Sequence, residues 1–324
     1  MVSSATASPV RVAMWYPMAW DERPAASLLE AVGGSLREWA GRATLIPGGY
    51  PRDLVPLRHA ELFACHSYPE GDPERLTVIA RLLTLWTMDD DVSERWGVGE
   101  AHAQAVLGVL RGTSLPGADP YLREWASVGA ALRDADMSED WLQLFFGHLE
   151  TWYASARHPE RGRREALEQY WRRRLDGTGA VPWLDLLEYV HRRELTPEQR
   201  NTEPVRNAYV FAAEDYVLAF NDPTSVERDA RQQVPNLCTL VADERSITPA
   251  EAAAELARQH LLRVRRRQAE VKTARRTHPD LTWWLDRACV HHLGMARAHV
   301  PDRSRYGELQ TVSGSSFHIR VITS

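Results

Sequence analysis

The feature of this chain that most constrains its fold is a helical repeat of apolar residues, which recurs along most of its 324 residues. In residues 74–88, for example, Leu76, Ile79, Leu83 and Trp86 follow at spacings of three and four, which puts them on one helix face. The apolar–polar alternation of strands is scarce. The sequence therefore predicts an all-α protein, with further helices over residues 101–111, 122–134, 139–156, 163–174, 182–193, 204–220, 249–276 and 279–299.

No linker, internal repeat or low-complexity segment divides the chain. The clearest helix breaks are short, at residues 112–117 and 176–179. An all-helical domain of this size can enclose one large core. We therefore predict one α-helical domain over residues 11–310, with a disordered N-terminal tail at residues 1–10 and a C-terminal tail at residues 311–324.

Composition excludes several classes of protein. A formal net charge of −5 argues against general nucleic-acid binding, because no global positive field attracts phosphate backbones. Cys65, Cys238 and Cys289 are too few and too scattered for a disulfide framework or a thiolate metal site. No apolar run of about 18 residues predicts a membrane span, and residues 1–10 lack the pattern of a signal peptide. We expect a cytoplasmic protein, compatible with a homodimer.

Two segments carry oxygen-bearing side chains at helical spacing. The first, Asp-Asp-Asp-Val-Ser-Glu at residues 89–94, follows the predicted helix over residues 74–88. In the second, Asn221, Ser225 and Asp229 recur every four residues and form one stripe along a helix. Mg²⁺ prefers oxygen ligands and shares its shell among carboxylates, waters and substrate phosphates. Together the segments indicate two walls of a magnesium diphosphate site.

Each segment also has an ordinary interpretation. An acidic run such as residues 89–94 is commonly a solvated helix face or an N-terminal cap. In the second segment, Asp222 would cap a new helix with Pro223 at its first position. If one helix instead continues through the segment, Pro223 removes a backbone hydrogen bond and costs about 3 kcal/mol, so we expect a kink there.

With two further elements, the segments resemble the motifs of bacterial class I terpene synthases. That family has an aspartate-rich motif of the form DDxxD or DDxxx(D/E), which DDDVSE fits, and a downstream motif of the form NDxxSxx(R/K)(D/E), which NDPTSVERD fits throughout. The stretch from Tyr170 to Pro182 resembles the region of the family's diphosphate-sensing arginine. Arg305-Tyr306 resembles its C-terminal Arg-Tyr pair. The resemblance implies an all-α class I terpenoid synthase bundle around a central active-site cavity.

The resemblance also implies a role for each matching residue. Three Mg²⁺ ions and a prenyl diphosphate substrate would meet in the cavity. The implied metal ligands are Asp89, Asp90, Glu94, Asn221, Ser225 and Asp229. The implied diphosphate contacts are Arg173, Arg174, Arg228, Arg305 and Tyr306, of which Arg174, Arg305 and Tyr306 are the implied catalytic residues.

Two registers remain open within this alignment. The aspartate-rich motif begins either at Asp89-Asp90 or at Asp90-Asp91, with Glu94 as its distal acid in both cases. We prefer the first, because an aromatic residue, Trp86, then stands three residues before the pair, as is usual in the family. The sensor arginine is Arg174 if Tyr170 and the following glycine and proline landmarks set the register. It is Arg173 if the Asp-Gly pair at residues 176–177 does, and we prefer Arg174.

Such a site supports ionisation of an allylic diphosphate, since metal ions and arginines stabilise the leaving group and no nucleophilic side chain is needed. The cation then requires a dry pocket in which aromatic faces stabilise positive charge by about 0.5–2 kcal/mol each. Large apolar side chains in the helices are equally suited to the core. The aromatic residues that we assign to this pocket are Trp86, Phe145, Phe146 and Phe220.

Farnesyl diphosphate, converted to a sesquiterpene, is the substrate we expect first, because that is the commonest activity in the resembled family. A diterpene synthase acting on geranylgeranyl diphosphate is the alternative. A chain-elongating prenyltransferase would show a second DDxxD motif, where this chain has the stripe of Asn221, Ser225 and Asp229. A catalytically silent helical binding protein would tolerate the loss of ligands, yet all the specified ligands are present.

Overall fold

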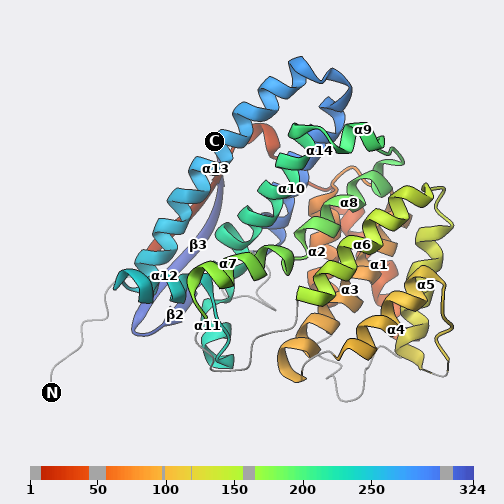
Figure 1. Ribbon diagram of the computed structural model, residues 1–324, viewed down its shortest axis with the longest axis horizontal. Helices are drawn as coiled ribbons and strands as arrows, with labels where there is room; N and C mark the ends of the chain where they lie inside the picture. Colours follow the sequence, from red (N-terminus) through yellow and green to blue (C-terminus); the bar gives the residue numbers. More distant parts are fainter. Residues whose placement is uncertain (1–8, 44–55, 97–98, 118, 156–164, 300–308) are drawn as a thin grey trace.

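The computed structural model describes residues 9–43, 56–96, 99–117, 119–155, 165–299 and 309–324, with only the backbone of residues 92–96 (Figure 1). Helices dominate this part of the chain, which confirms the predicted all-α class. They are α1 (Ala26–Arg42), α2 (Leu57–Ser67), α3 (Pro73–Trp96), α4 (Glu100–Arg111), α5 (Pro120–Arg133), α6 (Glu139–Ser155), α7 (Leu167–Asp176), α8 (Ala180–His191), α9 (Pro197–Arg200), α10 (Glu203–Asp215), α11 (Asp222–Gln232), α12 (Leu237–Arg245), α13 (Pro249–Thr277) and α14 (Thr282–His299). Among these described helices, none is long and apolar enough to span a membrane.

Helix α14 joins the two ends of the molecule. Figure 1 shows α3, α4, α5 and α6 grouped at one end, and α12 and α13 at the other. Helix α14 packs against α2 and α8 and also against α10 and α13, and most of its side chains are buried. Its approach to α2 requires a glycine, because a Cβ atom at Gly294 would lie 1.9 Å from the carbonyl oxygen of His66. The core therefore runs through α14, around which α2, α8, α10 and α13 pack.

A small sheet lies beside α13 (Figure 1). Its strands β1 (Val10–Tyr16), β3 (Ser315–Thr323) and β2 (Leu309–Val312) lie in that order, with β1 parallel and β2 antiparallel to β3. Strands β2 and β3 are joined by Ser313 and Gly314, which both have positive φ, as a tight two-residue hairpin requires. Strand β2 also packs against α11, so the sheet connects both ends of the chain to α11 and α13.

The sheet corrects the sequence analysis at both ends of the chain. Residues 311–324, predicted as a C-terminal tail, lie mostly in strands, and Val10, assigned to the N-terminal tail, begins β1. The other residues of that tail up to residue 8 lie outside the described residues. In β1, Val12, Met14 and Tyr16 alternate with more exposed residues. This pattern was too short to stand out, and its pairing partner lies about 300 residues away in sequence, so no local signal identifies it.

Pro223 interrupts the helix that carries the second motif, as expected. Helix α10 continues into a π-helical turn, Tyr216–Asn221, which leads directly into α11 with Pro223 in its first turn. A π turn shifts the hydrogen bonding from i→i+4 to i→i+5 and is one of the known causes of a local break in a helix. In place of a sharp kink, the helix therefore has a widened turn, and the last residue of that turn is Asn221.

Candidate active site

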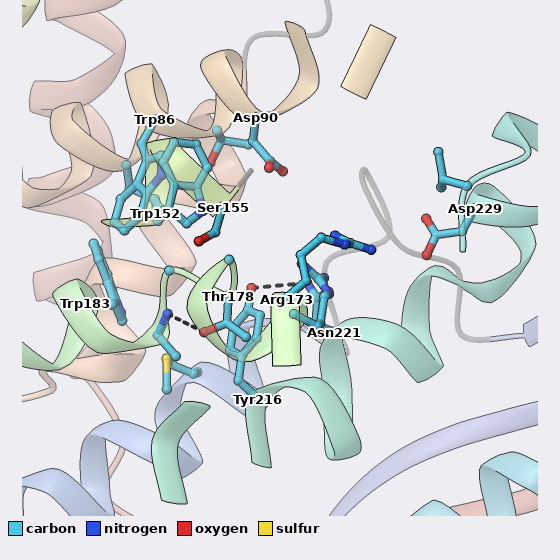
Figure 2. A pocket seen from close by; sticks show the side chains of 18 of the residues that line it. Trp86, Asp90, Trp152, Ser155, Arg173, Thr178, Trp183, Tyr216, Asn221 and Asp229 are labelled. Carbon is cyan, nitrogen blue, oxygen red and sulfur yellow. Dashed lines mark hydrogen bonds between the residues drawn. The ribbon is translucent and has the colours of Figure 1, made fainter. Parts of the chain in front are cut away.

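A cavity opens where α3, α6, α7, α8, the π turn and α11 meet, with further walls from α2 and α14. Figure 2 shows its two ends: Asp90, Asn221, Asp229 and Arg173 surround one side, and Trp86, Trp152 and Trp183 form the other. The residues that line it are His59, Phe63, Leu83, Trp86, Thr87, Asp90, Trp152, Ser155, Tyr170, Arg173, Arg174, Gly177, Thr178, Gly179, Ala180, Trp183, Tyr216, Asn221, Arg228, Asp229, Val234, Pro235 and Met295. One end is thus charged and the other aromatic.

The two neighbouring aspartates of the first motif have different environments. Asp90 lines the cavity. The side chain of Asp89 is buried away from it and accepts hydrogen bonds from the hydroxyls of Tyr121 (2.7 Å) and Tyr153 (2.6 Å), while His102 Nε2 lies 3.1 Å from its Oδ1. Both carboxylate oxygens of Asp89 therefore already have partners.

This difference bears on the register of the aspartate-rich motif. The preferred register made Asp89 its first ligand, whereas the geometry favours the alternative, in which the motif begins at Asp90-Asp91. Asp89 instead anchors the end of α3 to α4, α5 and α6 through its three partners. The side chain of Glu94, the distal acid in both registers, lies outside the described residues. Metal binding by Asp90 stays a prediction.

The second motif forms a hydrogen-bonded stripe along α11. Asn221 and Asp229 line the cavity, and the hydroxyl of Ser225 donates to Asp229 Oδ2 at 2.6 Å. Asn236, at the start of α12, donates to the same Asp229 oxygen at 2.7 Å and to the carbonyl oxygen of Asp222 at 2.8 Å. Since Asn236 Oδ1 accepts from the backbone of α12, its amide nitrogen is directed at the motif. Asn236 is a site residue that the sequence analysis missed.

The capping interpretation of the second motif is wrong. Asp222 is buried, and α11 has no side-chain cap. Asp222 instead accepts hydrogen bonds from the hydroxyl of Tyr170, from Arg174 Nε at 3.2 Å and from the backbone nitrogen of Leu237 at 3.0 Å. These contacts tie α11 to α7 and α12, so Asp222 fixes the position of the helix that bears the stripe.

Three arginines line the charged end of the cavity, each beside an acid. Arg173 binds Glu165 through Nε at 3.0 Å and a terminal nitrogen at 2.7 Å. Arg228 Nε lies 3.3 Å from Asp229 Oδ1. Their side chains remain between a fifth and a quarter exposed, with Arg173 and Arg228 at 21% and 22%. Both therefore keep access to an anion in the cavity.

Arg174 is the arginine most closely coupled to the second motif. It contacts Asp222 through Nε and donates to the side-chain oxygen of Asn221. Burial opposes its charge, but Asp222 and then Tyr170 and Tyr216, with a smaller contribution from Asp90, outweigh that effect and hold the pKa of Arg174 well above its ordinary value. Arg174 is therefore a fixed cation that touches an implied metal ligand. Arg305 and Tyr306, the other implied catalytic residues, lie outside the described residues.

We expect Arg174→Lys to lower turnover by about 100-fold, because a planar guanidinium holds phosphate oxygens in a fork that an ammonium cannot reproduce. Arg173→Lys is the matched control, and we expect it to stay within a few-fold of the unmodified protein. Steady-state diphosphate release measures both. The reverse ranking would move the sensor to Arg173, and full activity in both variants would place the diphosphate elsewhere.

The aromatic wall only partly matches the predicted cation pocket. Trp86 lines it and packs edge-to-face on Trp152, with ring centroids 5.2 Å apart, and Trp183 completes the wall. Phe145, Phe146 and Phe220 are not among the lining residues. They are core side chains instead: Phe145 stacks on Trp141, Phe146 packs on Phe145, and Phe220 packs on Tyr216 and His292.

The reason for this difference is the direction of the side chains. Helical periodicity tells which residues share a face, and it does not tell whether that face meets a cavity or another helix. Trp183, which the sequence analysis did not single out, lies on α8 just after the predicted helix break. It directly follows Pro182, the last residue of the stretch that resembles the sensor-arginine region, and that position is the signal that could have identified it.

Gly179 allows Trp86 to reach this wall. It has φ of 68°, and a Cβ atom there would lie 2.9 Å from Trp86 Cζ2. We expect Gly179→Ala to lower the free energy of unfolding by about 1–2 kcal/mol through the left-handed backbone alone, with the clash in addition. Gly147→Ala in α6, where nothing lies within 4 Å, should instead raise stability by about 0.5–1 kcal/mol. Urea denaturation measures both, and equal effects would contradict the argument.

The oxygen donors of the charged end fit Mg²⁺. Asp90 and Asp229 offer carboxylates and Asn221 offers an amide oxygen to the same cavity, and Mg²⁺ typically uses one or two carboxylates with water and substrate phosphates. Among the described residues, no three His, Cys, Asp or Glu side chains form a ready-made metal group. The arrangement is therefore one that a bound diphosphate would complete.

Comparisons with known proteins agree with this geometry. The model of a family described as terpene synthase family 2, C-terminal metal binding, matches residues 81–266. The chain is 25% identical over 242 residues to (2Z,6E)-hedycaryol synthase of Kitasatospora setae, covering 71% of this chain and 70% of that protein. It is 26% identical over 239 residues to 10-epi-cubebol synthase of Sorangium cellulosum, covering 69% and 74%.

A solved structure shares the fold. That of 2-methylisoborneol synthase from Streptomyces coelicolor, in complex with Mg²⁺ and geranyl-S-thiolodiphosphate, superposes with a TM-score of 0.75 at 15% identity. The match covers 88% of this chain and 95% of that one. At this identity the likeness concerns the fold, which is the helical bundle that the motif resemblance implied.

Proposed function

The chain belongs to terpene synthase family 2, and from this premise we propose that it ionises farnesyl diphosphate with the help of Mg²⁺ and cyclises the resulting cation to a sesquiterpene. As a class I terpene synthase it is a lyase, and its substrate and its use of Mg²⁺ are the parts that are proposed. The observation that carries the proposal is the two-ended cavity. Asp90, Asn221 and Asp229 lie at one end with three arginines, and tryptophans line the other.

The charged end suits the diphosphate. Mg²⁺ held by Asp90, Asn221 and Asp229 would neutralise the leaving group and act as a Lewis acid. Arg174 adds a fixed positive charge beside those ligands. Arg173 and Arg228 place two more positive charges along the cavity wall. The structure of 2-methylisoborneol synthase, which has the same fold, is a complex with Mg²⁺ and geranyl-S-thiolodiphosphate, and this supports the joint binding of metal and diphosphate.

The aromatic end suits the hydrocarbon chain. Trp86, Trp152 and Trp183 present indole rings to the cavity, and such rings both exclude water and stabilise a neighbouring cation. Once the C–O bond to the diphosphate breaks, the electron pair leaves with the oxygen and the cation remains against this wall. Water exclusion then gives the internal double bonds time to attack the cationic carbon.

The test is to incubate the purified protein and Mg²⁺ with geranyl, farnesyl, geranylgeranyl and geranylfarnesyl diphosphates, and to analyse the extracts by mass spectrometry. We expect the largest yield of cyclic hydrocarbon or alcohol from farnesyl diphosphate. Preference for geranylgeranyl diphosphate would make the protein a diterpene synthase. Parallel reactions with added isopentenyl diphosphate would reveal chain elongation, and no diphosphate release from any substrate would contradict the proposal.

A further inference from the structure

A cluster of buried polar side chains lies outside the cavity. Asp215, the last residue of α10, is fully buried and is bound by His260 of α13, by His292 of α14 and by Tyr16 of β1. His260 Nδ1 and His292 Nε2 each lie 2.6 Å from one of its carboxylate oxygens, and the Tyr16 hydroxyl donates at 3.1 Å. We call these four residues the Asp215 cluster. None of them is among the residues that line the cavity.

Hydrogen bonds fix the ring of His260 between two elements. Its Nε2 lies 2.9 Å from the backbone carbonyl oxygen of Trp15, and its Nδ1 faces the Asp215 carboxylate. Burial opposes ionisation of Asp215, but His260 and His292 outweigh that effect and hold the pKa of Asp215 well below its ordinary value. His260 therefore links β1 to the end of α10, with Asp215 as a charged acceptor in the core.

The cluster stands next to the most unusual backbone of the site. The residue after Asp215 begins the π turn, and that turn ends at Asn221. His292, held by Asp215, packs on Phe220 with ring centroids 5.7 Å apart. The two ends of the turn are also joined to each other, since the Asn221 amide donates to the Tyr216 hydroxyl at 3.2 Å. The cluster therefore holds the start of the turn and, through His292, the residue before Asn221.

A π turn needs such support. Its wide hydrogen-bonding pattern is rare, and backbone in a sparsely populated geometry persists only where surrounding contacts determine it. Pro223 prevents ordinary helical bonding just beyond the turn. A carboxylate with no solvent access and with both its oxygens hydrogen-bonded is a rigid attachment. Strand β1 supplies two of these contacts, from Tyr16 and from the Trp15 carbonyl.

We propose that Asp215 is a positioning residue for Asn221: its hydrogen bonds to His260 and His292 set the π turn and so aim the Asn221 amide into the cavity. The proposal rests on the proposed function for the role of Asn221 as a metal ligand. It also assigns a role to the sheet, because Tyr16 and the Trp15 carbonyl of β1 hold the Asp215 cluster in place.

The test compares Asp215→Asn with Asp185→Asn. Asp185 of α8 is a matched control, because it is equally buried and is bound by His148 Nδ1 at 2.7 Å and by the Tyr209 hydroxyl at 2.7 Å. The cavity does not include it. Calorimetry with Mg²⁺ and inorganic pyrophosphate measures ligand binding without turnover, and thermal melting followed by circular dichroism measures folding.

We expect Asp215→Asn to weaken binding of Mg²⁺ and pyrophosphate about 10-fold, while Asp185→Asn binds as the unmodified protein does, although both melt at lower temperature. Equal binding losses in the two variants, or none in folded Asp215→Asn, would overturn the proposal. If Asp215→Asn does not fold, His292→Gln replaces it, because glutamine keeps a donor toward Asp215 and removes the ring from Phe220. Absence of binding by the unmodified protein would instead refute the proposed function.

Discussion

Removal of divalent cations is expected to abolish product formation, and addition of Mg²⁺ is expected to restore it. Without a metal, a diphosphate entering the cavity meets the carboxylates of Asp90 and Asp229. The arginines cannot offset that repulsion fully, since each is paired with an acid: Arg173 with Glu165, Arg174 with Asp222 and Arg228 with Asp229. The positive charge must therefore come from bound cations, which the oxygen donors of this site would select as Mg²⁺.

The measurement is turnover of farnesyl diphosphate in excess chelator, followed by titration with Mg²⁺. Circular dichroism in the same solutions is the control, because the described fold is held by helix packing and should persist without metal. Undiminished turnover in excess chelator would contradict the proposed mechanism. Loss of helical signal together with turnover would show that the cation is structural.

Exchange of Asp90 for Asn is expected to lower turnover by at least about 100-fold with little loss of stability, because Asp90 faces the cavity and its charge would bind metal. Asp89→Asn is expected to act differently. It removes a charged acceptor from two tyrosine hydroxyls, and hydrogen bonds to charged groups contribute about 1.5–3 kcal/mol each. That variant should chiefly lose stability, and turnover should fall only as far as the fold is disturbed.

Urea denaturation and steady-state diphosphate release, measured on both variants, separate the two roles. A large loss of turnover in a stable Asp89→Asn protein, with an active Asp90→Asn protein, would restore the register that begins at Asp89. The pair is informative because the two residues are adjacent, have the same side chain and differ in the structure only in what surrounds them.

The segment from Arg174 to Asp229 shows which structural features can be predicted from local sequence. Spacing along one helix fixes which side chains share a stripe, so Asn221, Ser225 and Asp229 were identifiable from residues alone. The helical class was predictable for the same reason, because periodicity is a property of neighbours in sequence. Pro223 also predicted a disturbance at a definite position, since its missing N–H acts locally.

The tertiary structure decided what periodicity leaves open. Asp89 and Asp90 are equivalent in the sequence, and only the tyrosines that α5 and α6 bring to Asp89 separate them. The same holds for Asn236, which reaches Asp229 across a turn between helices, and for the strands β1 and β3, which pair from opposite ends of the chain. These contacts depend on where remote segments are brought together, and the energy that selects them comes from burial and hydrogen bonding in the folded core.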